Sequence, residues 1–196
     1  LNHANPTITN VTISGNTANY NGGGLGIWGG NPTLTNVTIS GNTSNEEGGG
    51  MHLNHANPTI TNVTISGNTS NSNGGGMRLS DSDAILTNVT IKGNTATTSG
   101  GMFIWKSNPT LTNVTINGNT ATNGGGGISL SHNCYPTLTN VTISGNTAGS
   151  SGGGIQCEDN SHPILLNTII AGNESNQIEF DASNSSNTIT ISYSDI

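Results

Sequence analysis

Two acidic residues are the strongest candidates for catalysis in this chain of 196 residues. Hydrolysis of a polysaccharide usually needs two carboxylates at a fixed separation, and a lyase needs a base together with stabilisation of negative charge. Glu158 and Asp181 are expected on adjacent repeats, with Glu179 beside them. No lysine or arginine is near them in the sequence to offset an acidic substrate. The pattern therefore favours an acidic cluster on a solvated edge over an enzyme.

The histidines offer a metal pair that the spacing argues against. His52 and His55 are three residues apart where a strand is expected to run into a turn, which converges two imidazoles poorly, and no third ligand is evident. The acidic residues also lack the ligand spacing of a calcium loop. We therefore expect neither a metal nor a cofactor.

Aromatic side chains suggest carbohydrate binding instead. Trp28 and Trp105 fall on one expected outward column, three repeats apart, which is roughly 14 Å at the spacing of β-strands. Both could stack on the sugar rings of a chain lying along that column, or they could merely cover their neighbours. Most of the unusual residues lie nearby, so the candidate ligand-binding residues are Trp28, His52, Arg78, Phe103 and Trp105.

The two cysteines lie in neighbouring repeats and leave two alternatives open. Cys134 falls in a turn, whereas Cys157 replaces an inward aliphatic residue. They could form a disulfide, or Cys157 could be a buried free thiol that packs as a small hydrophobic residue.

The charge composition excludes several classes of partner. Three basic residues stand against ten acidic ones, which gives a formal net charge of −7. Such a chain lacks the basic surface of a nucleic-acid binder. The sequence also has no apolar run long enough for a membrane span.

A repeat must position all of these residues. The string T-I/L-T-N-V-T-I recurs with its asparagine at 10, 36, 62, 88, 113 and 140, and a degenerate copy has Asn167. Each copy has about 26 residues, and its aliphatic residues alternate with polar ones, which is typical of strands. The strands can bury their apolar faces only by winding around them. The sequence therefore predicts an all-β parallel β-helix (solenoid) with three short strands per coil and about seven coils.

Two asparagine columns are expected at the corners of this solenoid. Asn10 and its equivalents lie between two strands, and Asn16 and its equivalents follow the third strand. Asparagine tolerates left-handed backbone and carries both a donor and an acceptor, so each column can form a hydrogen-bonded ladder. Asn10-Val11-Thr12 is formally a glycosylation sequon. We expect a ladder asparagine to be buried and therefore inaccessible to glycosylation.

The string GGGI together with NPTLTNVTISGNT resembles the right-handed parallel β-helix repeats of secreted bacterial proteins. These belong to the pectate-lyase-like superfamily and are similar to repeats of chlamydial polymorphic outer-membrane proteins. The resemblance covers residues 1–196 as one segment and implies a right-handed coil, an extracellular location, and a polysaccharide along the first-strand face. That superfamily contains lyases, hydrolases and adhesins, so it does not fix the function. The chain starts and stops within a coil, which predicts further coils or another chain at both ends.

Threonine dominates the second strand of each coil. The expected face is flat and uncharged and resembles the T-x-T faces of insect antifreeze proteins, although exposed strand positions favour threonine in general. The alternative ice-binding face comprises Thr7, Thr9, Thr33, Thr35, Thr59, Thr61, Thr87, Thr110, Thr112, Thr137 and Thr139.

These observations predict a non-catalytic extracellular or cell-surface module with a structural or adhesive role. Its expected partner is a polysaccharide or cell-surface glycan on the first-strand face. The alternatives are an ice-binding protein and a polysaccharide lyase or hydrolase.

Overall fold

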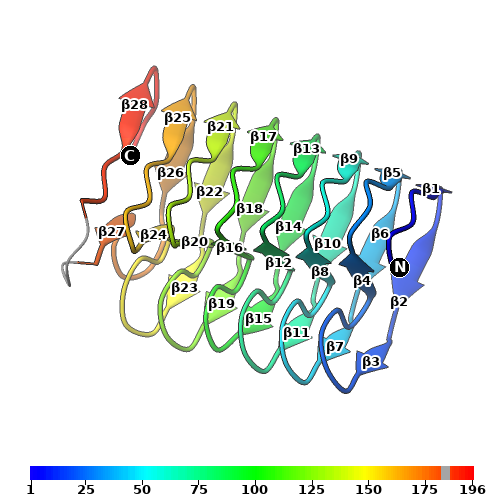
Figure 1. The fold of residues 1–196 in the computed structure, drawn as a ribbon. Coiled ribbons are helices and arrows are strands. Elements are labelled where there is room, and N and C mark those ends of the chain that lie inside the picture. Colours follow the sequence, from blue (N-terminus) through cyan, green and yellow to red (C-terminus); the bar gives the residue numbers. More distant parts are fainter. Residues whose placement is uncertain (182–185) are drawn as a thin grey trace.

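The computed structural model describes residues 1–181 and 186–196 and forms a parallel β-solenoid. Figure 1 shows the coils side by side along one axis, from the N-terminal coil in blue to the C-terminal coil in red. Equivalent strands of successive coils pair in parallel and make four sheets. The predicted fold class and coil length of about 26 residues are confirmed.

Three of the sheets contain the predicted strands. The first-strand sheet is made of β4 (Leu25–Trp28), β8 (Met51–Asn54), β12 (Met77–Ser80), β16 (Met102–Trp105), β20 (Ile128–Ser131), β24 (Ile155–Cys157) and β27 (Ile178–Phe180). The threonine sheet is made of β1 (Thr7–Thr9), β5 (Thr33–Thr35), β9 (Thr59–Thr61), β13 (Ile85–Thr87), β17 (Thr110–Thr112), β21 (Thr137–Thr139), β25 (Ile164–Leu166) and β28 (Thr190–Ser192). The third-strand sheet is made of β2 (Thr12–Ser14), β6 (Thr38–Ser40), β10 (Thr64–Ser66), β14 (Thr90–Lys92), β18 (Thr115–Asn117), β22 (Thr142–Ser144) and β26 (Ile169–Ala171).

A fourth, very short strand occurs in most coils and was not among the three predicted. Two residues are too few to show an alternation, so the sequence pattern gave no sign of it. This short-strand sheet is made of β3 (Thr17–Ala18), β7 (Thr43–Ser44), β11 (Thr69–Ser70), β15 (Thr95–Ala96), β19 (Thr120–Ala121) and β23 (Thr147–Ala148). Among the described residues, no helix is present that could cross a membrane.

The core is one continuous cluster of aliphatic side chains inside the coils, with several from each coil. Leu53, Ile60 and Ile65 represent one coil, and all three are fully buried. Glycines before the first strand let successive coils approach closely. A Cβ atom at Gly49 would lie 2.5 Å from the carbonyl oxygens of Gly75 and Thr69, so only glycine fits there.

The two asparagine columns differ in burial. Asn68 is 1% exposed, and its Oδ1 accepts hydrogen bonds at 3.0 Å from both the backbone N–H and the Nδ2 of Asn42. Asn62 is exposed, has a φ of +54°, and donates one hydrogen bond from Nδ2 to Oδ1 of Asn36 at 3.2 Å. The expectation that the column of Asn10 and Asn62 is buried was wrong, because the left-handed bend turns these side chains outward. Burial therefore does not protect the sequons.

Candidate functional site

Trp28 forms an open aromatic platform at the end of β4. Its side chain is on the outer face of the first-strand sheet and is 40% exposed. The indole leans over Gly26, since a Cβ atom at Gly26 would lie 2.3 Å from Cζ3 of the ring. The ring of His52 in the next coil contacts the indole, with 5.6 Å between the ring centroids. Any larger residue at position 26 would displace the indole from the sheet.

A hollow of about 510 Å³ adjoins this platform and is lined by amide and imidazole side chains. The ring of His3 lies over Gly29, because a Cβ atom there would be 2.4 Å from its Nδ1. His3 and His55 are both exposed, and both have left-handed backbone. No carboxylate or ammonium group lines the hollow, which is formed by Asn2, His3, Trp28, Gly29, Asn54 and His55.

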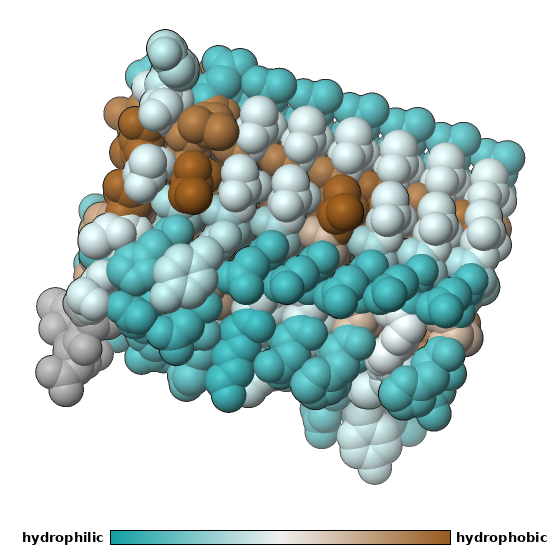
Figure 2. All heavy atoms as spheres, turned by 45° about the horizontal axis from the view of Figure 1, so that its top comes forward, coloured by the Kyte–Doolittle hydropathy of each residue, from teal (hydrophilic) through white to brown (hydrophobic). Residues whose placement is uncertain are grey.

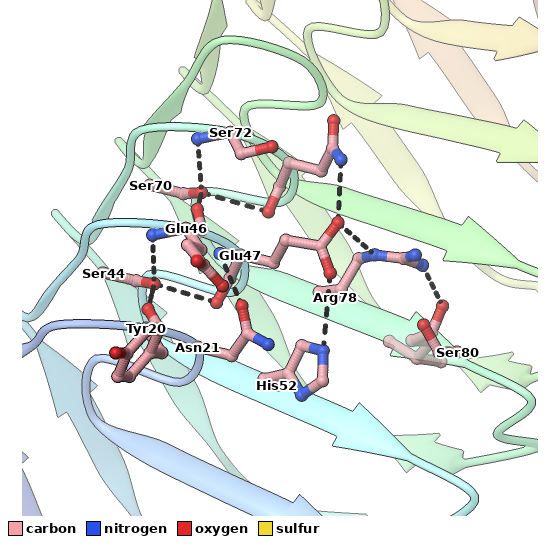
Figure 3. Close-up of polar contacts among 12 residues, drawn as sticks. Tyr20, Asn21, Ser44, Glu46, Glu47, His52, Ser70, Ser72, Arg78 and Ser80 are labelled. Carbon is pink, nitrogen blue, oxygen red and sulfur yellow. Dashed lines mark hydrogen bonds and ion pairs between the residues drawn. The ribbon is translucent and has the colours of Figure 1, made fainter.

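Glu47 organises a second, buried part of the same face, shown in Figure 3. Its Oε1 accepts a hydrogen bond from Asn73 Nδ2 at 2.9 Å and lies 3.3 Å from Arg78 Nε, while its Oε2 lies 3.6 Å from His52 Nε2. The contact with His52 is the main cause that lowers the pKa of Glu47 to about 2, with Asn73 and Arg78 adding to it against the effect of burial. Glu47 is therefore ionised throughout the physiological pH range.

Two of the predicted ligand-binding residues, His52 and Arg78, belong to this network. His52 is 2% exposed and Arg78 is 7% exposed, so neither side chain projects freely from the face. Burial lowers the pKa of Arg78 from its usual value, while the charge of Glu47 opposes that shift. The sequence could not place Glu47 over the first-strand sheet, because the placement depends on how a turn folds back between coils.

Serine hydroxyls hold this turn in place in two successive coils. Ser44 Oγ donates to the carbonyl oxygen of Glu47 at 3.0 Å and accepts from the N–H of Glu46 at 3.2 Å. Ser70 Oγ makes the equivalent contacts one coil later, to the carbonyl of Asn73 at 3.1 Å and from the N–H of Ser72 at 3.2 Å. Ser44 thus holds the backbone of the turn that carries Glu47, while Asn73, Arg78 and His52 contact the carboxylate itself.

Trp105 shares the outward column of Trp28, as predicted, but its surroundings are different. The register runs from Trp28 through Asn54 and Ser80 to Trp105. Lys106 Nζ lies 4.1 Å from the centroid of the Trp105 ring, and the guanidinium of Arg78 lies 5.8 Å from it. Arg78 also stacks on Phe103 at 4.6 Å. The aromatic surface is therefore open at Trp28 and covered by cations at Trp105.

Ser131, His132 and Asp159 have the residue types of a catalytic triad without its geometry. Ser131 Oγ lies 2.8 Å from His132 Nδ1, and Asp159 Oδ2 lies 2.9 Å from the same nitrogen. Ser131 Oγ also donates directly to Asp159 Oδ2 at 2.9 Å. In a working triad the acid and the nucleophile contact opposite nitrogens of the imidazole. This cluster therefore does not activate a serine.

The acidic cluster lies where the sequence predicted it. Cys157 pairs with Phe180, which puts Glu158 and Asp181 beside one another, and Gln156 pairs with Glu179. Burial, followed by the charges of Asp181 and Asp159, raises the pKa of Glu158. In residues 1–181 and 186–196, no group of three or more histidine, cysteine or acidic side chains is arranged to hold a metal ion.

Both cysteines are free thiols in the structure. Cys134 and Cys157 are buried, and Cys134 Sγ donates to the carbonyl oxygen of Ser131 at 3.1 Å. Burial raises the pKa of Cys157 to about 12, so the thiol stays protonated and unreactive.

Comparison with known proteins identifies the architecture. The family model described as the right-handed β-helix region matches residues 2–140 and, in an overlapping second match, residues 52–196. No curated protein and no solved structure matches the chain significantly.

Proposed function

Because the chain belongs to the right-handed β-helix family, we propose that it is a non-catalytic extracellular or cell-surface module that binds carbohydrate at the Trp28 platform. The observation that carries this proposal is an exposed indole beside a hollow lined by amide and imidazole groups that can form hydrogen bonds. The resemblance to secreted repeat proteins and the scarcity of lysine support the proposed extracellular location.

The chemistry of the site suits a neutral sugar. A pyranose ring has an apolar face of C–H groups, which packs on an aromatic surface, and a rim of hydroxyls. Asn2 and Asn54 each offer donors and an acceptor to those hydroxyls, and the rings of His3 and His55 add further ones. An acidic sugar would find no ammonium or guanidinium group in the hollow.

The scaffold supports this role because the platform is already formed. The backbone of Trp28 pairs with the segment 1–3, donating its N–H to the carbonyl of Leu1 at 2.8 Å and accepting from His3 N–H at 2.7 Å. The indole also leans over Gly26 and contacts His52. A ligand would therefore bind without first ordering the aromatic group, which preserves affinity.

A glycan array probed with the full chain tests the proposal, with isothermal titration on the best neutral oligosaccharide. Trp28→Ala should weaken binding at least about tenfold, which corresponds to about 1.4 kcal/mol. Trp105→Ala is the matched control, because it removes a tryptophan from the same column where Lys106 covers the ring. It should leave the affinity within about twofold.

Two results would contradict the proposal. One is a folded wild-type chain that binds no glycan at millimolar concentration. The other is an unchanged affinity of Trp28→Ala for a glycan that the wild type binds. Circular dichroism of each variant establishes that the coils are intact.

A further inference from the structure

The threonine sheet presents the most regular surface of the molecule. Threonine holds eleven of the twelve outward positions from β1 to β21, and the exception is Ile85. Parallel pairing keeps every coil in the same register, for example Thr33 with Thr59 and Thr35 with Thr61. Figure 2 shows the array as pale rows along the solenoid, interrupted by brown aliphatic residues. The rows end at β25, where Ile164 and Leu166 replace threonine.

The hydroxyls of this array are available to a ligand. All eleven threonines are exposed or half-buried, and within residues 1–181 and 186–196 none of their hydroxyls hydrogen-bonds to another protein group. The threonine hydroxyls that do make such bonds, including those of Thr97, Thr147 and Thr168, are on other parts of the coil. Each position therefore offers one free hydroxyl beside one methyl group.

The spacing of the array is close to a spacing in ice. Neighbouring strands in a sheet lie about 4.8 Å apart, and alternate residues of one parallel strand lie about 6.6 Å apart. Water oxygens joined by hydrogen bonds of about 2.75 Å at tetrahedral angles lie about 4.5 Å from their second neighbours. Hydroxyls repeated along the solenoid can therefore occupy positions near those of successive water molecules in a lattice.

The lack of charge on the threonine sheet and the rigidity of the coils also favour contact with an ordered water lattice. The outward positions of β1 to β21 carry no charged residue, and the exposed asparagines of the Asn62 column border them. A charged group holds its own hydration shell, whereas an amide or hydroxyl can replace a water molecule. The buried column of Asn68 and the backbone ladders hold the coils in fixed positions, so the array keeps its spacing before a ligand arrives.

From these features we propose that the threonine sheet binds ice. A flat, uncharged and periodic surface matches a periodic solid over its whole length, whereas a single small ligand binds in a concave pocket. This activity is separate from carbohydrate binding at Trp28, because the two surfaces belong to different sheets.

Thermal hysteresis and incorporation into a growing ice hemisphere test the proposal with the full chain. The wild type should show hysteresis, and Thr61→Lys should reduce it at least about fivefold. Thr64→Lys is the matched control, because Thr64 is half-buried on the third-strand sheet of the same coil. Trp28→Ala is a second control, which should leave ice binding unchanged even if it abolishes glycan binding.

Three outcomes would overturn the proposal. The first is a folded wild type without hysteresis or incorporation into ice. The second is an equal loss in Thr61→Lys and Thr64→Lys, which would indicate a nonspecific effect of charge. The third is retention on crystalline cellulose combined with exclusion from ice, which would identify a crystalline polysaccharide as the ligand.

Discussion

One outward position of the first-strand sheet holds a different residue in each of three successive coils, namely Gly26, His52 and Arg78. The threonine sheet instead repeats threonine at nearly every outward position. The first sheet is partly covered by turns and contains an ionic network around Glu47. The outward face of the threonine sheet is open and uncharged in its strands β1, β5, β9, β13, β17 and β21. Both are built on the same backbone. Inward and turn residues thus make the scaffold, and outward residues are free to supply either individual contacts or a repeated surface.

The two asparagine columns give the largest expected contrast in stability: Asn62 follows β9 of the threonine sheet, and Asn68 follows β10 of the third-strand sheet. Asn68→Gly removes an acceptor from Asn42 and a donor to the carbonyl of Ile39, all in a buried position. Unfolding in urea should show a loss of about 3–4 kcal/mol, because buried polar groups lose their partners.

The same substitution in the exposed column should have a small effect. Asn62→Gly keeps a residue that accepts the left-handed φ of +54° and loses only hydrogen bonds that water can replace. We expect a change of at most about 1 kcal/mol. Equal losses in the two variants would mean that burial does not distinguish the columns.

The sequence predicted the coil and its register but not this difference between the columns. Alternation of aliphatic and polar residues, repeated every 26 residues or so, fixes which strands exist and which residues face inward. Asn62 and Asn68 both lie at strand ends in similar Asn-x-Thr/Ser contexts, so their types do not separate them. Their burial depends on the direction of each corner, which is a property of the folded backbone.

The candidate site was predicted in part for a related reason. The shared column of Trp28 and Trp105 follows from the period alone. Lys106 covers the ring of Trp105, and the turn that carries Glu47 covers His52. A repeat pattern does not encode such contacts between side chains and turns. The signal that was missed is Gly26, an outward glycine two residues before a tryptophan.

The ionic network gives the next largest contrast between the sheets. Arg78→Met keeps most of the side-chain volume but removes the cation next to the half-buried carboxylate of Glu47. The free energy of unfolding should fall by about 2–3 kcal/mol, since the half-buried carboxylate loses its guanidinium partner and keeps only the contacts with His52 and Asn73. Lys92→Met in β14 removes an exposed cation from the same coil and should change stability by at most about 0.5 kcal/mol. Similar small changes in both variants would show that the network does not stabilise the coil.

Two acidic residues should respond to pH in opposite directions. The pKa of Glu47 is lowered from 4.5 to about 2 in the folded chain, so its contribution to stability is present above about pH 4.5 and is lost as the pH falls towards 2. The pKa of Glu158 is raised, so protonation on acidification relieves a destabilising charge.

Urea unfolding measured from pH 7 to pH 2 tests this difference. Glu47→Gln should lower stability at pH 7 and flatten its decline below pH 4.5. Glu158→Gln should leave stability at pH 7 unchanged or raise it by at most about 1 kcal/mol, because it removes the cost of burying this charge and its repulsion from Asp181 and Asp159. A loss of stability in Glu158→Gln would contradict the inference that the charge of Glu158 destabilises the fold.

The smallest expected effect on stability comes from repairing the threonine sheet. Ile85 is 49% exposed and interrupts a row that runs from Thr7 to Thr137, pairing with Thr59 on one side and Thr110 on the other. Ile85→Thr keeps a β-branched residue on the strand and exposes less apolar surface, so the free energy of unfolding should change by at most about 0.5 kcal/mol. If the array acts as one periodic surface, thermal hysteresis should rise by up to about twofold, because the row of threonine hydroxyls then continues from Thr59 through position 85 to Thr110. A fall in hysteresis would instead show that the methyl-rich surface around Ile85, and not the regular hydroxyl spacing, contacts the ice.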